Sequence, residues 1–228
     1  MRPCAVLGML GFGIIAGSAA TAAAAERLNE AGRFAVGAER LFGVAWSKES
    51  ATVGGMDVSE SDTSFSLFTK QVSASGLEAP RLAFDYFVID GLSVGGAVGY
   101  ASVATNTSSG SSNTDGPTVH GWLLTPRVGY AYMFNDTIGL WPRAGITYTT
   151  LSLDESAANT SVSSHFVALS VEAPLVITPA PHAAILIAPT LDWGFTGSEN
   201  ATVMAAGSGS IDETALSLGL HAGLAIWF

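Results

Sequence analysis

The chain has 228 residues, of which 48% are hydrophobic and only 12% are charged, and its net charge is −10. This length suits a single domain, and the acidic balance argues against a nucleic-acid partner. The only cysteine, Cys4, lies in the N-terminal leader, so the rest of the chain needs no disulfide framework and carries no thiol chemistry.

Residues 1–25 have the pattern of a secretory signal peptide. Arg2 gives a positive start, a short apolar run follows, and Ala23-Ala24-Ala25 supplies the small residues of a cleavage site. The apolar run is shorter than the ~20 residues of a membrane-spanning helix, which disfavours an uncleaved anchor. No later apolar run approaches that length, so any insertion into a membrane must use strands. We expect residues 26–33 to form a periplasmic lead-in and residues 34–228 to form the folded domain.

Eight stretches of alternating hydrophobic and small or polar residues follow the leader. Strict alternation with a period of two predicts β-strands that have one apolar face and one polar or small face. Short turns, such as Asp90-Gly91, alternate with long segments rich in Ser, Thr, Gly and Asp, which we expect to be irregular loops. The predicted strands are 34–46, 80–89, 92–103, 119–134, 138–150, 164–177, 182–195 and 214–228, and the predicted long loops are 47–79, 104–118, 151–163 and 197–213.

Three features fit this scheme poorly. Arg40 falls on the apolar face of the first strand, where a cation at the middle of a bilayer costs about 2–4 kcal/mol. A bulge near Glu39-Arg40, or an Arg40 side chain that reaches the interface, would remove the conflict. The second strand starts either near Ser64 or at Pro80. Four prolines stand inside predicted strands, from which central ladders exclude them: Pro126, Pro142, Pro174 and Pro189.

The last stretch, from Thr214 to Phe228, carries the clearest pattern of the chain. Seven alternate residues from Leu216 to Phe228 are apolar, and the four residues that alternate with them from Ser217 to Gly223 are Ser, Gly, His and Gly. This segment resembles the C-terminal assembly signal of bacterial outer-membrane barrels, whose conserved places are filled here by His221, Gly223, Ile226 and Phe228. A C-terminal strand of a secreted soluble sandwich is the rival interpretation.

In outline the chain resembles the small eight-stranded outer-membrane barrels, such as the transmembrane domain of outer-membrane protein A and the opacity-type surface proteins. The resemblance implies an all-β fold, an up-and-down antiparallel eight-stranded transmembrane β-barrel, in the bacterial outer membrane. Its implied partners are outer-membrane lipid and, through the C-terminal strand, the barrel-assembly machinery. No cofactor is implied. Aromatic residues near strand ends fit interfacial girdles: Trp46, Tyr100, Trp122, Tyr132, Tyr148, Trp193 and Trp227.

Eight residues with ionisable side chains fall on the inward faces of the predicted strands. Eight strands leave an interior that side chains just fill, and buried charges must pair. We therefore expect a charge network that plugs the lumen, with a narrow path for ions or small hydrophobic compounds as the alternative. The predicted network is Glu39, Arg81, Asp85, Arg127, Arg143, Glu172, Asp192 and His221.

The sequence offers little for catalysis or metal binding. A nucleophile needs a base in contact with it, and no histidine has a Ser or Asp at a spacing that presents both on one strand face near the surface. We expect no catalytic residues and no metal site, with a membrane-embedded lipid-modifying enzyme as a second alternative. The acidic long loops are expected to be solvated, and the preferred role is structural or surface interaction.

Overall fold

The structure is a computed structural model that describes residues 27–53, 56–67, 76–109, 112–155, 160–203 and 207–228. The predicted signal peptide lies outside these residues. No helix in this part of the chain is long and apolar enough to cross a membrane.

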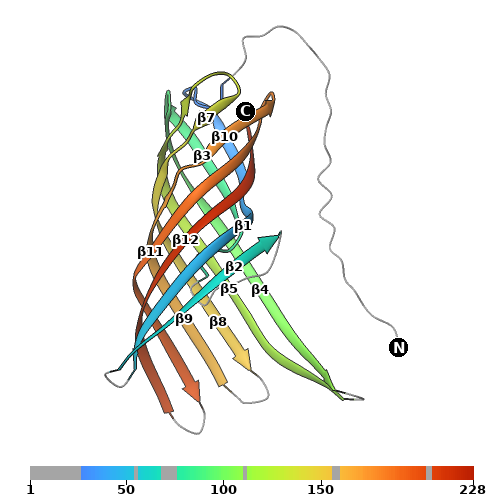
Figure 1. Cartoon of the computed structure of the whole chain (residues 1–228), viewed down its shortest axis with the longest axis vertical. Coiled ribbons are helices and arrows are strands. Elements are labelled where there is room, and N and C mark those ends of the chain that lie inside the picture. Colours follow the sequence, from blue (N-terminus) through green and yellow to red (C-terminus); the bar gives the residue numbers. More distant parts are fainter. Residues whose placement is uncertain (1–26, 54–55, 68–75, 110–111, 156–159, 204–206) are drawn as a thin grey trace.

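Twelve strand segments form a closed antiparallel barrel of eight strands, because four of the eight are interrupted (Figure 1). Closure comes from β1, which pairs with the last strand from Ala35–Trp227 to Ala51–Glu213. The eight strands are β1 (Phe34–Val53); β2 (Met56–Leu67) with β3 (Arg81–Ile89); β4 (Leu92–Ser109); β5 (Ser112–Tyr130) with β6 (Tyr132–Met133); β7 (Ile138–Leu140) with β8 (Arg143–Glu155); β9 (Thr160–Glu172) with β10 (Leu175–Ala180); β11 (Ala183–Val203); and β12 (Gly207–Trp227).

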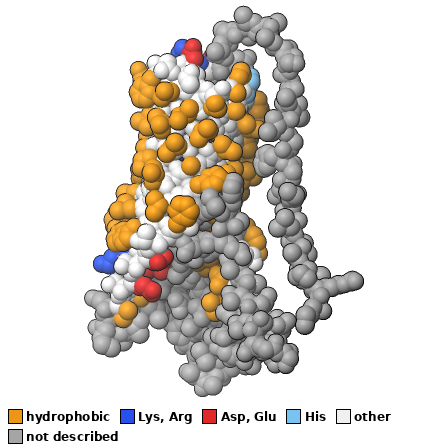
Figure 2. Space-filling view, turned by 45° about the vertical axis from the view of Figure 1, so that its right-hand side comes forward, with side chains coloured by type: hydrophobic (Ala, Val, Ile, Leu, Met, Phe, Trp, Pro, Cys, Tyr) orange, Lys and Arg blue, Asp and Glu red, His pale blue; other side chains and the backbone are white. Residues whose placement is uncertain are grey.

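The alternation of the sequence sets which way each side chain points. Leu218 and Val171 are 46% and 39% exposed, whereas Arg127 and Glu172 are only 5% and 7% exposed. The apolar faces therefore look outward and the charged ones inward. Figure 2 shows hydrophobic side chains spread over the barrel wall, with charged side chains only beyond the ends of this belt on the visible face.

The strands continue well beyond the apolar belt, which corrects our expectation of long irregular loops. The β4–β5 ladder runs on to Ser109–Ser112, the β8–β9 ladder to Glu155–Thr160 and the β11–β12 ladder to Val203–Gly207. Backbone groups that leave the membrane still pair with their neighbours, and Ser and Thr side chains are compatible with a strand in water. The short turns gather at the opposite end, at the top of Figure 1. By the usual orientation of such barrels this is the periplasmic end, and the long hairpins mark the outer end.

Arg40 points into the barrel, so its predicted place on the lipid face is wrong. The β1–β12 register shifts between Ala38 and Phe42, and Arg40 has a φ of 54°, in the left-handed region. This bulge directs Glu39 and Arg40 to the same side, where both are buried. The bulge that we considered at these residues removes the conflict, and Arg40 joins the interior charges.

The second strand contains both of the starts that we considered. β2 pairs with the outer half of β1, from Phe42–Leu67 to Val53–Met56, and β3 pairs with the periplasmic half, from Phe34–Tyr86 to Glu39–Arg81. Between the two segments, residues 76–80 leave the wall and enter the lumen; we call these residues the strap. Among the described strands, β2 pairs with β1 alone, so its other edge has no ladder with β4.

Pro142 and Pro174 lie at strand breaks and Pro189 lies opposite one, which explains why the barrel tolerates them. The backbone N–H of Ala173 donates to Pro189 O at 3.2 Å, that of Trp141 to Pro174 O at 2.8 Å, and that of Tyr130 to Pro142 O at 2.9 Å. Each proline carbonyl thus keeps a partner, while the missing N–H falls at a break in the ladder. Pro126 pairs with Gly96 on one side and stands at a skipped rung of the β5–β8 ladder on the other.

Candidate functional site in the barrel lumen

The periplasmic end of the lumen is closed by an apolar plug. Phe87 and Trp141 are fully buried with ring centroids 5.3 Å apart, and Leu28 and Trp227 join the same cluster. Trp227 therefore points inward and does not belong to the interfacial aromatics with which we grouped it. Leu28 belongs to the expected periplasmic lead-in, so this segment covers the mouth of the barrel.

Backbone hydrogen bonds hold the lead-in in place across the barrel mouth. The N–H of Gly32 donates to Phe87 O at 2.8 Å, and that of Gly91 donates to Asn29 O at 2.7 Å. Arg27 forms an exposed ion pair with Asp136 at 2.7 Å. The lead-in therefore caps the barrel mouth.

Arg127 is the centre of the charged layer above the plug. It donates to Glu39 through both terminal nitrogens, at 2.7 and 2.9 Å, and to both oxygens of Asp85. It also donates to Glu172 at 3.0 Å. Arg143 donates to Glu39 at 2.6 Å, lies 2.9 Å from Glu172, and stacks over the Trp141 ring at 4.6 Å. Three carboxylates and two guanidinium groups thus share one buried network, supplied by β1, β3, β5, β8 and β9.

A second ion pair lies beside this network. Arg40 donates to both oxygens of Asp192, at 2.7 and 3.1 Å. The Ser170 hydroxyl also donates to Asp192, and its oxygen is linked at 2.6 Å to Thr147, which in turn is linked at 2.9 Å to Thr125. A row of hydroxyl groups therefore runs along the inner wall from β5 through β8 to β9 and ends on Asp192 of β11, so these buried polar groups all have hydrogen-bond partners.

The strap fills the outer part of the lumen. The Leu77 carbonyl accepts hydrogen bonds from Arg40 at 2.7 Å and from Arg81 at 2.6 Å, and the Leu77 side chain packs with Phe166 and Ala168. The Glu78 carboxylate accepts hydrogen bonds from the hydroxyls of Ser64 and Ser217, both at 2.8 Å. The strap therefore bridges the lumen from one wall to the other.

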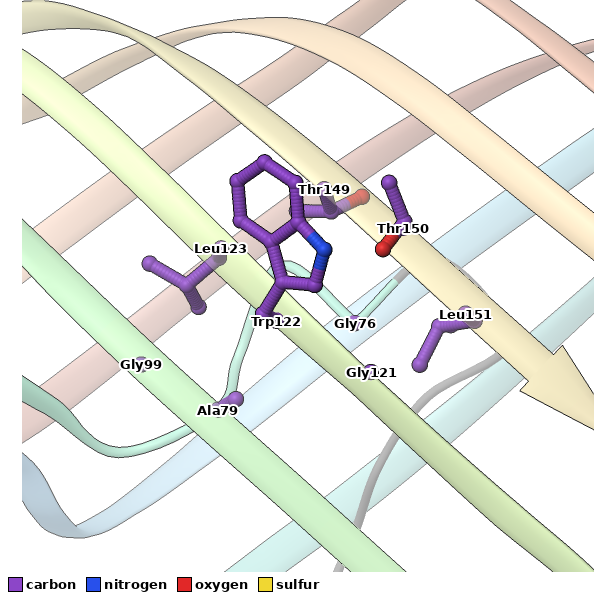
Figure 3. Close-up of a pocket in the computed structure, with 9 residues that line it drawn as sticks. All are labelled: Gly76, Ala79, Gly99, Gly121, Trp122, Leu123, Thr149, Thr150 and Leu151. Atoms are coloured by element: carbon purple, nitrogen blue, oxygen red, sulfur yellow. The ribbon is translucent and has the colours of Figure 1, made fainter.

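Small residues of the wall make room for the strap. Figure 3 shows Gly76 and Ala79 behind the wall strands, next to Gly99 and Gly121, while the Trp122 ring lies on the other side of the wall. A Cβ atom added at Gly99 would lie 2.8 Å from Pro80 O and 2.9 Å from Leu123 Cγ. The close approach of two backbones thus requires glycine at this position.

His221 is buried, and its described hydrogen-bond partner is a neutral hydroxyl group. Its Nδ1 lies 3.0 Å from Thr190 Oγ1, and a Cβ atom added at Gly43 or Gly219 would meet the imidazole ring. Gly223 in turn leaves space for the backbone of the Glu39 bulge, to which an added Cβ would come within 2.9 Å. Two residues of the predicted assembly signal therefore shape the lumen, while Ile226 and Phe228 face outward.

The structure buries all eight residues of the predicted network, and it adds Arg40 and Glu78. With Arg40, four arginines face the four carboxylates of the predicted set. Arg81 is the exception to pairing, since no described carboxylate lies within ion-pair distance of it. The alternating pattern did not identify Arg40 because the bulge changes which residues of β1 point inward. It did not identify Glu78 because the strap has no strand pattern.

One Ser–His contact lies on the outside of the barrel. Ser198 Oγ is 3.1 Å from His165 Nε2 across the β9–β11 ladder, a pairing that spacing along one strand does not reveal. Nδ1 of the ring lies 3.5 Å from the same hydroxyl, and among the described residues no carboxylate is hydrogen-bonded to the imidazole. The described residues also contain no group of three His, Cys, Asp or Glu side chains arranged to hold a metal ion.

The closed eight-stranded ring, the apolar outer belt and the filled polar lumen define the protein as a small outer-membrane β-barrel. Its place is the bacterial outer membrane. No protein-family model matches the chain, and no curated protein matches it by sequence.

Solved structures of outer-membrane proteins share the fold. The chain is similar to outer membrane protein OprG from Pseudomonas aeruginosa, with a TM-score of 0.54 and 14% identity over 88% of this chain and 97% of that one. It is similar to AlkL, solved in DMPC bilayers, with a TM-score of 0.52 and 13% identity over 93% and 96%. It is also similar to the outer membrane protease OmpT from Escherichia coli, with a TM-score of 0.50 and 8% identity over 86% and 97%. At these identities the likeness concerns the fold alone.

Proposed function

We propose that this protein is an occluded outer-membrane barrel with a structural or surface-interaction role, and that it neither conducts ions nor catalyses a reaction. The observation that carries the proposal is the filling of the lumen at three levels. The apolar plug closes the periplasmic end, the Arg127 network closes the middle, and the strap closes the outer part. A continuous water path would have to displace all three.

The outer hairpins supply the interaction surface of this proposal. Four two-stranded ladders continue past the apolar belt and project as paired strands (Figure 1). Strand pairing gives each extension a regular backbone that continues from the barrel wall, which suits contact with another surface. The remaining partners in this proposal are membrane lipid and the assembly machinery, which would read the outward Ile226 and Phe228.

Planar-bilayer recording of the refolded protein tests occlusion. We expect no discrete openings, because a buried charge network without a water path gives no route for ions. Steady openings that disappear when Arg127 or Glu172 is substituted would contradict the proposal and favour the narrow channel. Mobility on gels before and after heating would verify that each variant is folded.

A second candidate function is the binding of small apolar molecules through the side of the barrel. The edge of β2 that no described strand pairs with supports it, since Phe65 on this strand is 71% exposed and pairs with Val44 of the apolar belt. An apolar molecule at membrane depth would reach the wall between β2 and β4. Saturable binding of N-phenyl-1-naphthylamine to the refolded barrel, lost in a Phe65→Glu variant, would favour this role over the purely structural one.

A further inference from the structure

A pocket on the outer face of the barrel lies apart from the lumen. It has a volume of about 340 Å³ and is formed by β1, β11 and β12. The strand register places Lys48 of β1 opposite Leu216 of β12, and Leu216 opposite Trp193 of β11. The side chains that line it are those of Lys48, Ser50, Leu191, Trp193, Thr214 and Leu216, with Ala215 behind them.

The pocket stands at the boundary between the apolar belt and the polar hairpins. The next row of paired residues toward the periplasm is Trp46, Leu218 and Leu191, all apolar and exposed. The next residues along the strands toward the outer end are Ser50 and Thr214. The pocket therefore has an apolar floor on the membrane side and hydroxyl groups with an ammonium group on the water side. Tryptophan at such a boundary is typical of the membrane interface.

Lys48 is unusual among the cations of this acidic chain. The chain has nine Lys and Arg residues: four arginines lie in the lumen, Arg27 and Arg33 lie at the periplasmic end, and Arg2 and Lys70 fall outside the described residues. Lys48 is thus the only cation that the described residues place on the outer half of the barrel exterior.

No described carboxylate neutralises Lys48. Alternation puts the adjacent Glu49 on the opposite face of β1. On β2 the residue opposite Lys48 is Ser61, and Asp62 shares a face with Ser64, which points into the lumen. The ammonium group is therefore available to an anion that arrives from the membrane side.

We infer that this pocket binds a phosphorylated lipid of the outer leaflet. The lipid phosphate would accept hydrogen bonds from Lys48 Nζ and from the hydroxyls of Ser50 and Thr214, and an acyl chain would lie along Leu191, Leu216 and Trp193. Both halves of the ligand are needed, since an exposed lysine alone holds an anion only weakly in water. A membrane brings the phosphate to the height of the ammonium group and strengthens the contact.

Native mass spectrometry of the refolded full barrel, titrated with bisphosphorylated lipid A, tests this inference. We expect Lys48→Gln to lower the affinity about five- to tenfold, the effect of one cation at an anionic surface, and Lys48→Arg to retain it. Arg27→Gln, which removes an exposed cation at the periplasmic end, is the matched control and should leave binding unchanged.

Two further arms separate the phosphate contact from the apolar one. Lipid A without its phosphates should bind the wild type and Lys48→Gln equally weakly, while Trp193→Leu should weaken binding of both lipids. Equal binding of bisphosphorylated lipid A by the wild type and Lys48→Gln would overturn the inference. So would occupancy by inorganic phosphate in place of the lipid. Heat-modifiable gel mobility would show that each variant is folded.

Discussion

At the scale of single residues, the interior of this barrel depends on charges that share partners. Glu39 accepts hydrogen bonds from Arg127 and Arg143, and Arg127 also donates hydrogen bonds to Asp85 and Glu172. Breaking a buried ion pair by removing one partner is strongly destabilising, because the other charge stays buried without compensation. Glu39 and Arg40, neighbours in the sequence, supply one anion and one cation to this layer because of a single bulge.

The first prediction concerns Glu39. Replacement by glutamine removes the carboxylate that Arg127 and Arg143 share while both arginines stay buried, so we expect the free energy of unfolding in urea to fall by about 3–5 kcal/mol. Tryptophan fluorescence in micelles measures the change. The control is Glu60→Gln, an exposed carboxylate on β2, which should shift stability by less than about 0.5 kcal/mol. A loss below about 1 kcal/mol for Glu39→Gln would contradict the network.

The second prediction concerns the pair of Arg40 and Asp192. Arg40→Met and Asp192→Asn should each destabilise the barrel by several kcal/mol, because each leaves a buried charge unpaired. The double variant should lose less than the sum, with a coupling of about 1–3 kcal/mol in a double-mutant cycle. Additive losses would mean that the two side chains do not interact.

At the scale of elements, the breaks within strands shape the barrel as much as the strands do. The second strand is split so that the strap can enter the lumen, and three neighbouring strands break near prolines in a way that preserves carbonyl partners. These breaks lie side by side in the periplasmic half of the wall, where the N–H of one strand finds a proline carbonyl of the next. This matching explains why prolines occur inside the wall.

The third prediction tests the seat of the strap. Gly99→Val places a side chain against Pro80 O and Leu123, so we expect a loss of about 1–3 kcal/mol from overpacking and displacement of the strap. Chymotrypsin should then cut after Leu77, which is fully buried in the wild type. Val98→Ala, a neighbouring change on the lipid-facing side, should leave Leu77 protected. Protection of Leu77 in Gly99→Val would show that the strap does not depend on this glycine.

The fourth prediction compares two positions on β11. Pro189→Ala should change stability by less than about 1 kcal/mol, since its nitrogen faces a break in the ladder and its side chain is exposed. Ile187 has ladder partners on both sides, Leu175 and Ala222, so Ile187→Pro should cost about 3 kcal/mol or more. Urea titration followed by heat-modifiable gel mobility measures both. Equal losses of stability in the two variants would contradict the view that Pro189 is tolerated because it faces a break in the ladder.

At the scale of the whole molecule, the barrel separates its charges by location. The arginines of the lumen are buried, the exposed arginine Arg27 lies at the periplasmic end, and the outer hairpins carry Lys48 on their exterior. The wall is a closed ring, and its occlusion comes from three layers contributed by different parts of the chain. Orientation and occlusion are therefore properties that no single strand possesses.

The fifth prediction uses external trypsin on intact cells. The protease should leave the segment from Arg81 to Phe228 as one fragment, although it contains three arginines, because all three are buried in the lumen. Mass spectrometry of the recovered fragment measures the outcome. Cleavage at Arg27 or Arg33 from outside would reverse the orientation, and cleavage at Arg127 would show that the lumen is open. Urea-denatured protein, cut at every arginine, is the control.

The sequence by itself determined most strands of the apolar belt, the direction of most of their side chains and the class of protein. Alternation is a local property of the sequence, so the outward direction of Leu218 and the inward direction of Arg127 can be predicted without knowing which strands pair with theirs. The same reading named the buried charges of β3, β5, β8, β9, β11 and β12, because each lies on a regular strand.

Only the tertiary structure decided the exceptions. Arg40 turns inward because β12 shifts register against β1, and Leu77 and Glu78 enter the lumen because Arg40, Arg81, Ser64 and Ser217 hold them there. The prolines are tolerated because neighbouring strands break at matching places. Each of these depends on hydrogen bonds between segments far apart in the chain, and a local pattern carries no record of such partners.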